Sequence, residues 1–336
     1  MREGRLTPVT RRQHATIALL LVLLALAGAA AISSGPGGLA FDDPELLGFR
    51  AFRAIAAAVV GLALGAAGVV LQSMMRNPLA SPDLLGVAGG AGLAMSLAAY
   101  FAGLSGNAAK FAWAGPWATA AAVLGALAAL TLVYVLGRRK RGLDPATVIL
   151  VGVVVGILSA SLTQLLQQLM PPEQGRSAAS AFLGGIRENE LGWAELSLIA
   201  ALTLACVTWA AFLGPAMDAS AMGDDEAISV GVSLPRLRIS LFIVAGVLSA
   251  GAVVIAGPIG FVGLICPHFI RLASGPRHRG LVIGASLAGA LLVLGADTFV
   301  RLMPLQTGRL PLSVITAVIG GPVLVHMLRS RNGRIA

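Results

Sequence analysis

The chain has 336 residues, of which 57% are hydrophobic and only 12% charged, and its mean hydropathy is +0.87. Soluble globular domains carry about 25% charged residues, so this composition excludes a soluble enzyme and indicates a protein that crosses a membrane several times. The net charge of +9 does not indicate a nucleic-acid partner, because the basic residues lie in short clusters between apolar segments.

Nine apolar segments are long enough to cross a hydrocarbon core of about 30 Å. They lie near residues 15–34, 53–74, 85–102, 112–136, 146–169, 192–214, 236–256, 280–300 and 311–328. A tenth segment, 258–271, follows Gly257 and is interrupted by Pro267, which predicts a half helix or re-entrant segment. We therefore predict an all-α fold, a polytopic membrane bundle of about ten transmembrane helices including one short broken helix.

The first apolar segment has two interpretations. Arg11 and Arg12 followed by an apolar run are also typical of a secretory signal peptide. The run exceeds the usual core of about 7–15 residues in such peptides, which favours a retained first helix.

The basic residues predict the orientation of the bundle. With ten crossings both termini lie on one side, and the 24 basic residues then divide 17 to 7 in favour of that side. Cytoplasmic loops carry the excess of lysine and arginine, so both termini are expected in the cytoplasm. We expect one transmembrane domain, 1–336, with a cytoplasmic loop at 215–235.

The sequence also bears on the energy source. An ATP-binding P-loop needs Gly-Lys-Ser/Thr, but Lys110 follows Ala109 and Lys140 follows Arg139. ATP would therefore be hydrolysed by a partner.

Ion-coupled transporters usually carry intramembrane ionisable groups. The one acid deep in an apolar segment is Asp297, which we expect to pair with Arg301 near a helix end. An ion-driven secondary transporter is the alternative mechanism, and a structural membrane subunit is a third reading.

Five segments in order along the chain resemble the FecCD family of binding-protein-dependent importer permeases. They are RAFRAIAAAVVG at 50–61, LQSMMRNPLASPDLLGVAGGAG at 71–92, AGPIGFVGLICPHFIR at 256–271, ADTFVR at 296–301 and LPLSVITAVIGGP at 310–322. The family carries iron siderophores, haem and cobalamin. The resemblance implies the permease of a type II ATP-binding cassette (ABC) importer.

The second of these segments contains a helix-loop-helix corner. Its prolines end the second helix, and Asp83 is placed to cap the third. The resemblance implies that this loop lies at the cytoplasmic end near the pathway. Its residues are Asn77, Pro78, Leu79, Ser81 and Pro82.

An acidic segment lies in the 215–235 loop. Its three acids and closing glycine suit a short helix, although the pattern alone favours a solvated acidic loop. The resemblance implies the coupling helix that docks on the ATP-binding subunit. The residues are Met222, Gly223, Asp224, Asp225, Glu226, Ala227, Ile228, Ser229, Val230 and Gly231.

Three arginines lie on the opposite side of the predicted membrane. Arg50 and Arg53 stand on one face of the second helix, where snorkelling at a helix end is the plain explanation. The resemblance implies that Arg50, Arg53 and Arg301 receive carboxylates from the binding protein, which guanidinium groups bind bidentately. Where the family commonly has Glu-Leu-Pro, this chain has Arg309-Leu310-Pro311.

No cofactor or catalytic group is predicted. Cys266 and His268 offer too few ligands for a closed metal site, and Cys206 is expected to pack. The expected partners are ATP-binding cassette subunits, an extracytoplasmic substrate-binding protein and a second permease copy or paralogue in the cell membrane. The expected cargo is a ferric siderophore, with haem or cobalamin as the alternative.

Overall fold

The fold is that of a computed structural model, which describes residues 8–34, 43–105, 116–139, 142–175, 184–186, 191–303 and 310–332. The long helices are α1 (Pro8–Ser33), α2 (Pro44–Met75), α3 (Val87–Leu104), α4 (Pro116–Gly137), α5 (Pro145–Leu169), α7 (Trp193–Phe212), α10 (Leu234–Ala256), α12 (His278–Leu302) and α13 (Leu312–Asn332). The short elements are η1 (Pro82–Leu85), α8 (Gly214–Met222), α9 (Asp224–Ser229), α11 (Val262–Ser274) and the hairpin strands β1 (Arg138–Arg139) and β2 (Gly142–Leu143).

Eight helices in the described part of the chain are long and apolar enough to cross a membrane. They are α1 from Arg11, α2, α3, α4 from Trp117, α5, α7, α10 and α12. Two shorter apolar helices, α11 and the Leu312–Val323 part of α13, add to them. The prediction of an all-α polytopic membrane bundle is confirmed.

The helices begin where the local sequence supplies caps. Asp43 accepts hydrogen bonds from the backbone N–H groups of Glu45 and Leu46, and Pro44 opens α2 with its fixed φ. Asp144 and Pro145 do the same for α5. Because of its cap, α2 begins at Pro44 rather than near residue 53, so its first turns carry Glu45 and the arginines.

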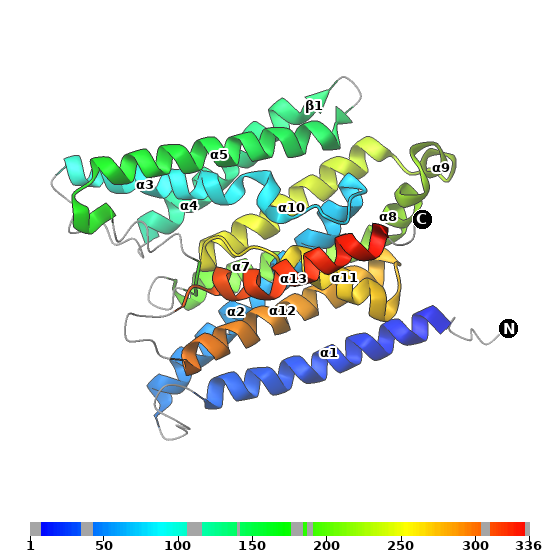
Figure 1. Ribbon diagram of the computed structural model, residues 1–336, viewed down its shortest axis with the longest axis horizontal. Coiled ribbons are helices and arrows are strands. Elements are labelled where there is room, and N and C mark those ends of the chain that lie inside the picture. The colour runs from blue at the N-terminus through cyan, green and yellow to red at the C-terminus, as the bar shows by residue number, and fades with distance from the viewer. Residues whose placement is uncertain are drawn as a thin grey trace.

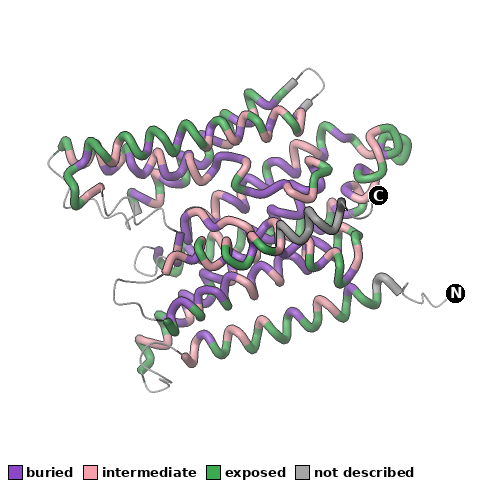
Figure 2. Tube along the Cα trace, viewed as in Figure 1, coloured by how far each residue is buried: buried purple, intermediate pink, exposed green. Residues whose placement is uncertain are grey.

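Helix α2 forms the centre of the bundle. It packs on α10, α11 and α12, while α3, α4 and α5 form a separate group that α10 joins to α2 (Figure 1). Helix α1 lies on the far side against α12. Buried positions follow this order, since α2 is buried along most of its length whereas α1 and α5 expose many side chains (Figure 2). The exposed leucines of these outer helices suit contact with lipid.

The α2 and α12 backbones approach each other through small residues. A Cβ atom on Gly61 would lie 2.1 Å from the carbonyl oxygen of Gly289, and one on Gly65 would lie 2.1 Å from that of Ala285. Only a residue without a side chain fits such a contact, which is how membrane helices pack closely.

The short segment near 258–271 differs from the predicted broken helix. The irregular part precedes the helix, where Gly257 and Phe261 have φ of 65° and 68°, and Pro267 lies inside α11. Pro267 has no N–H to donate to the carbonyl of Gly263, four residues before it. That carbonyl instead accepts a hydrogen bond of 3.1 Å from Nε2 of Gln72, so the proline does not break the helix.

Candidate functional sites

A buried cluster of charges lies at the end of the bundle where α2 begins, here called the Arg53 end. Asp297 of α12 is fully buried and accepts from Arg53 of α2, with Nε at 2.9 Å and Nη2 at 2.8 Å. Nε of Arg301 lies 3.3 Å from the same carboxylate. The predicted pairing of Asp297 with Arg301 is confirmed, but Arg53 is the partner that holds the carboxylate bidentately.

The two other arginines of this end contact the last turn of α1. Arg301 donates to the carbonyl of Ala31 at 3.0 Å, and Arg50 donates to that of Ser33 at 3.2 Å. The last carbonyls of a helix lack intrahelical donors and carry the negative end of its dipole. The two guanidinium groups therefore fix the end of α1 to α2 and α12.

The three arginines predicted to receive a binding protein are thus engaged within the chain. Arg50, Arg53 and Arg301 are 5%, 3% and 6% exposed. The surface beside them is an open groove of about 500 Å³, whose lining includes Glu45, Phe49 and Trp193. Docking through these arginines stays a prediction, and it requires their guanidinium groups to gain access to a partner. Arg309 lies outside the described residues.

The opposite end of the bundle, here called the α9 end, contains the predicted loop near the pathway. Asn77 closes a tight turn, because its Oδ1 accepts from the backbone N–H of Leu79 at 3.0 Å. The prediction that Asp83 caps α3 is wrong. Asp83 lies within η1 and accepts from Ser81 at 3.0 Å, whereas the N-cap of α3 is Gly86, whose φ of 68° favours glycine.

The acidic segment 222–231 contains the short helix that the resemblance implied, in place of the solvated loop that the pattern alone favoured. Helix α9 spans Asp224–Ser229, and Gly231 follows it with φ of 86°. Asp224 is ion-paired with Arg76 and with Nη2 of Arg238, the latter at 3.0 Å. Asp225, Glu226 and the apolar side chains of Met222, Ile228 and Val230 are exposed. The segment therefore exposes both acids and apolar groups.

Asp218 links α8 to the start of α12. Its Oδ1 accepts from the backbone N–H of His278 at 2.9 Å and lies 2.7 Å from Nδ1 of that ring. Burial raises the pKa of the Asp218 carboxyl, but the His278 hydrogen bonds and the charges of His278 and Arg277 outweigh it, so the pKa lies below its ordinary value. The carboxylate is thus ionised at neutral pH, and Nδ1 is the donor.

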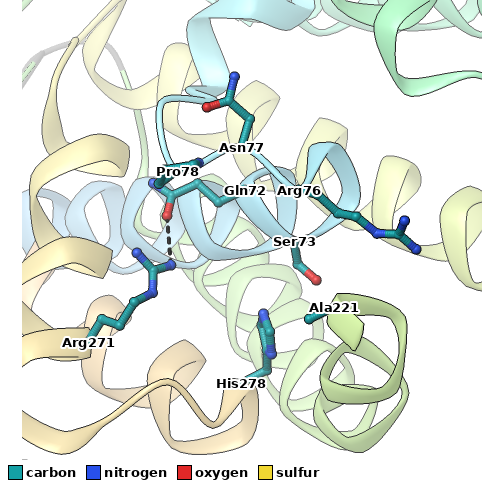
Figure 3. Close-up of a pocket in the computed structure, with 8 residues that line it drawn as sticks. All are labelled: Gln72, Ser73, Arg76, Asn77, Pro78, Ala221, Arg271 and His278. Atoms are coloured by element: carbon teal, nitrogen blue, oxygen red, sulfur yellow. Dashed lines mark hydrogen bonds between the residues drawn. The ribbon is translucent and has the colours of Figure 1, made fainter. Parts of the chain in front are cut away.

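A cavity of about 290 Å³ opens between these elements (Figure 3). Gln72, Ser73 and Arg76 come from the end of α2, Arg271 from α11, and His278 from α12. Asn77, Pro78 and Ala221 complete the lining. The structure therefore brings the predicted loop near the pathway, the end of α8 and a group of basic side chains to one place.

The sequence matches the FecCD transport family over residues 14–330, nearly its whole length. The chain belongs to this family. The resemblance of its five segments to FecCD permeases is thereby confirmed.

Individual FecCD relatives match over most of their own lengths. The hemin transport system permease protein HmuU of Yersinia pestis is 30% identical over 99% of both chains. The vitamin B12 import system permease protein BtuC of Vibrio cholerae is 36% identical over 82% of this chain and 80% of its own. The iron(3+)-hydroxamate import system permease protein FhuG of Bacillus subtilis is 34% identical over 88% of this chain and 86% of its own.

A solved structure shares the fold of this FecCD chain. A metal-chelate type ABC transporter in an inward-facing conformation superimposes with a TM-score of 0.82 and 27% sequence identity. The match covers 94% of this chain and 99% of the other. The helix arrangement is therefore that of an ABC importer permease.

Sequence reasoning missed several side chains that the FecCD fold brings together. Gln72 and Arg271 lie 199 residues apart in the chain, yet Nη2 of Arg271 donates to Oε1 of Gln72 at 3.0 Å. The signal available was weak, because a single polar residue near a helix end has many explanations. Pro267 leaves the carbonyl of Gly263, four residues before it, without a backbone donor, and this was a clue that another side chain such as Gln72 donates to it.

Proposed function

We propose that this chain is the membrane permease of an ATP-driven importer that translocates a ferric siderophore delivered by an extracytoplasmic binding protein. The observation that carries the proposal is the FecCD match over residues 14–330. The fold of a metal-chelate type ABC transporter, shared over 94% of the chain, supports it.

The cargo is the finer part of the proposal. FhuG, a relative of 34% identity, is named for iron(3+)-hydroxamate import, which supports a ferric siderophore. HmuU and BtuC, named for hemin and vitamin B12, match about as well and make those cargoes the second candidate.

The ATPase would dock on residues 222–231. Exposed Asp225 and Glu226 beside exposed Ile228 and Val230 give a surface with both charge and apolar area, as protein interfaces require. The ion pairs of Asp224 with Arg76 and Arg238 connect α9 to the end of α2 and to α10. A displacement of α9 by the ATPase would therefore be transmitted to α2 through the ion pair of Asp224 with Arg76.

The orientation follows from the same proposal. The α9 end faces the cytoplasm with both termini, and the Arg53 end faces the binding protein. The arginine cluster would then receive carboxylates of the binding protein once the guanidinium groups become accessible. Two permease copies, or this chain and a paralogue, would enclose the pathway, and 1–336 would act as one domain.

Reconstitution tests the function. The permease, its ATPase and its binding protein are placed in proteoliposomes, and uptake of a ferric hydroxamate, haem and cobalamin is measured with ATP or with a proton gradient alone. We expect ATP-dependent uptake of the ferric hydroxamate that needs all three components. Uptake driven by the gradient alone would contradict the importer mechanism. ATP-dependent uptake of haem or cobalamin in its place would contradict only the cargo.

A further inference from the structure

The cavity at the α9 end has the features of a binding site for an anion. It lies between the last turn of α2, the end of α8, helix α11 and the first turn of α12 (Figure 3). Its volume of about 290 Å³ is at the lower limit of small-molecule sites, which span roughly 300–1,000 Å³. A ligand held there is therefore small, or is one group of a larger molecule.

Ser73 provides a buried hydroxyl without a partner. Its residue is 8% exposed, and no described group lies within hydrogen-bonding distance of its Oγ. Buried helix serines usually donate to the carbonyl four residues before them, as Ser274 and Ser286 do here at 3.0 Å and 2.8 Å. The Ser73 hydroxyl instead points into the cavity toward Ala221 and His278 (Figure 3). An unpaired buried donor costs free energy, which an acceptor in the cavity would recover.

Arg271 provides the positive charge. It is partly buried, and within the described residues its hydrogen-bond partner is the neutral amide of Gln72, not a carboxylate. That amide is itself held in place, because its Nε2 donates to the carbonyl of Gly263. The guanidinium is therefore oriented while its charge is not neutralised, which is the arrangement that oxyanions bind best.

His278 and Arg76 also line the cavity. The bond from His278 to Asp218 fixes the imidazole ring below Ser73 (Figure 3). The guanidinium of Arg76 points away from Ser73 (Figure 3) and is ion-paired with Asp224 of α9. Asp218 and Asp224 are thus paired with His278 and Arg76, and Arg271 keeps its charge available for a ligand.

We propose that this cavity binds a phosphate oxyanion, either free phosphate or the phosphate of an anionic lipid headgroup. Ser73 donates a hydrogen bond to it and Arg271 supplies the charge. The bound anion joins α2, α11 and α12 at the point where α8 and α9 meet the bundle. This site is independent of the cargo and of the transport mechanism proposed above.

Thermal unfolding of the purified full-length permease in detergent tests the site. Inorganic phosphate is titrated against chloride at constant ionic strength, and the rise in Tm gives an apparent Kd. Phosphatidylglycerol and phosphatidylcholine are offered in parallel, and retained lipid is counted by native mass spectrometry. The variants are Ser73→Ala, Arg271→Gln and Arg271→Lys. The control is Arg236→Gln, which removes an exposed arginine at the same end.

We expect binding to weaken about tenfold in Arg271→Gln and about threefold in Ser73→Ala, with Arg236→Gln unchanged. Arg271→Lys should retain part of the affinity because it keeps the charge. Stabilisation by phosphate identifies a free anion, and preferential retention of phosphatidylglycerol identifies a lipid headgroup. The proposal is overturned if neither probe binds, or if Ser73→Ala, which preserves the fold most closely, binds both as the original protein does.

Discussion

The ion pair between Arg53 and Asp297 joins residues that lie 244 positions apart in the chain. Both side chains are almost fully buried, so neither charge has water as an alternative partner. A buried pair of this kind adds modestly to stability as a whole, but removing one member leaves an uncompensated charge.

Asp297→Asn should therefore lower the free energy of unfolding by about 3–5 kcal/mol, because Arg53 and Arg301 lose the buried carboxylate that they share. Tm of the purified permease measures the effect. Glu45→Gln removes an exposed carboxylate at the same end and should change stability by less than about 0.5 kcal/mol. Equal effects of the two variants would show that the pair is not structurally important.

For single residues, the sequence indicated which side chains are important better than it indicated which partners they contact. Asp297 and Arg301 are four residues apart, a spacing that brings helix side chains together, and the structure confirms their pairing. The bidentate bond to Arg53 depends on how α2 packs against α12, and no local pattern encodes that. The same holds for Ser73, whose open hydroxyl is visible only once α2, α8 and α12 are assembled.

Helices α2 and α12 form their contact by bringing two glycine-containing faces together. A Cβ on Gly289 would lie 2.2 Å from the carbonyl oxygen of Gly61 and 3.0 Å from its carbonyl carbon. Both are backbone atoms, which cannot move aside as a flexible side chain would. The separation of the two helices is therefore set by the absence of side chains.

Gly289→Ala should destabilise the permease by about 1–3 kcal/mol, since the added methyl group forces the helices apart. The matched control is Gly295→Ala in the same helix, where a Cβ would meet nothing within 4 Å. That control should be neutral, or stabilising by up to about 1 kcal/mol, through higher helix propensity. Thermal unfolding compares them, and a Gly289→Ala protein as stable as the control would contradict the packing argument.

Helix existence was readily predicted, because each apolar segment is long and few other structures satisfy backbone groups in lipid. The exact residues at which the helices begin and end were harder to predict. The early start of α2 depends on the cap by Asp43 and on arginines that find partners inside the bundle. The continuity of α11 through Pro267 depends on Gln72 from another helix, which a reading of 258–271 alone does not reveal.

At the scale of the whole molecule, the α9 end carries the exposed acids Asp225 and Glu226 of the proposed docking segment. We expect Asp225→Lys with Glu226→Lys to reduce co-purification of the ATPase at least about tenfold, because it reverses the charge of the proposed docking segment. The control Glu45→Lys makes the same change at the opposite end and should leave the complex intact. Full recovery of the ATPase with the double variant would exclude residues 222–231 from the interface.

Composition and motif order were sufficient to predict the class of the whole molecule, since 57% hydrophobic residues and five ordered segments leave few alternatives. They were not sufficient for its sites. The arginines that the resemblance places at a docking surface are buried here, and burial depends on the neighbours of α2, above all α1.

The two arginine bonds to the end of α1 bear on how the polypeptide matures. A signal peptidase cutting after Ser33 would remove the carbonyl oxygens of Ala31 and Ser33, to which Arg301 and Arg50 donate, and would leave two buried cations with fewer acceptors. The first helix thus stabilises the bundle by supplying acceptors to two buried arginines, and a processed form lacking it should unfold more easily than the intact chain.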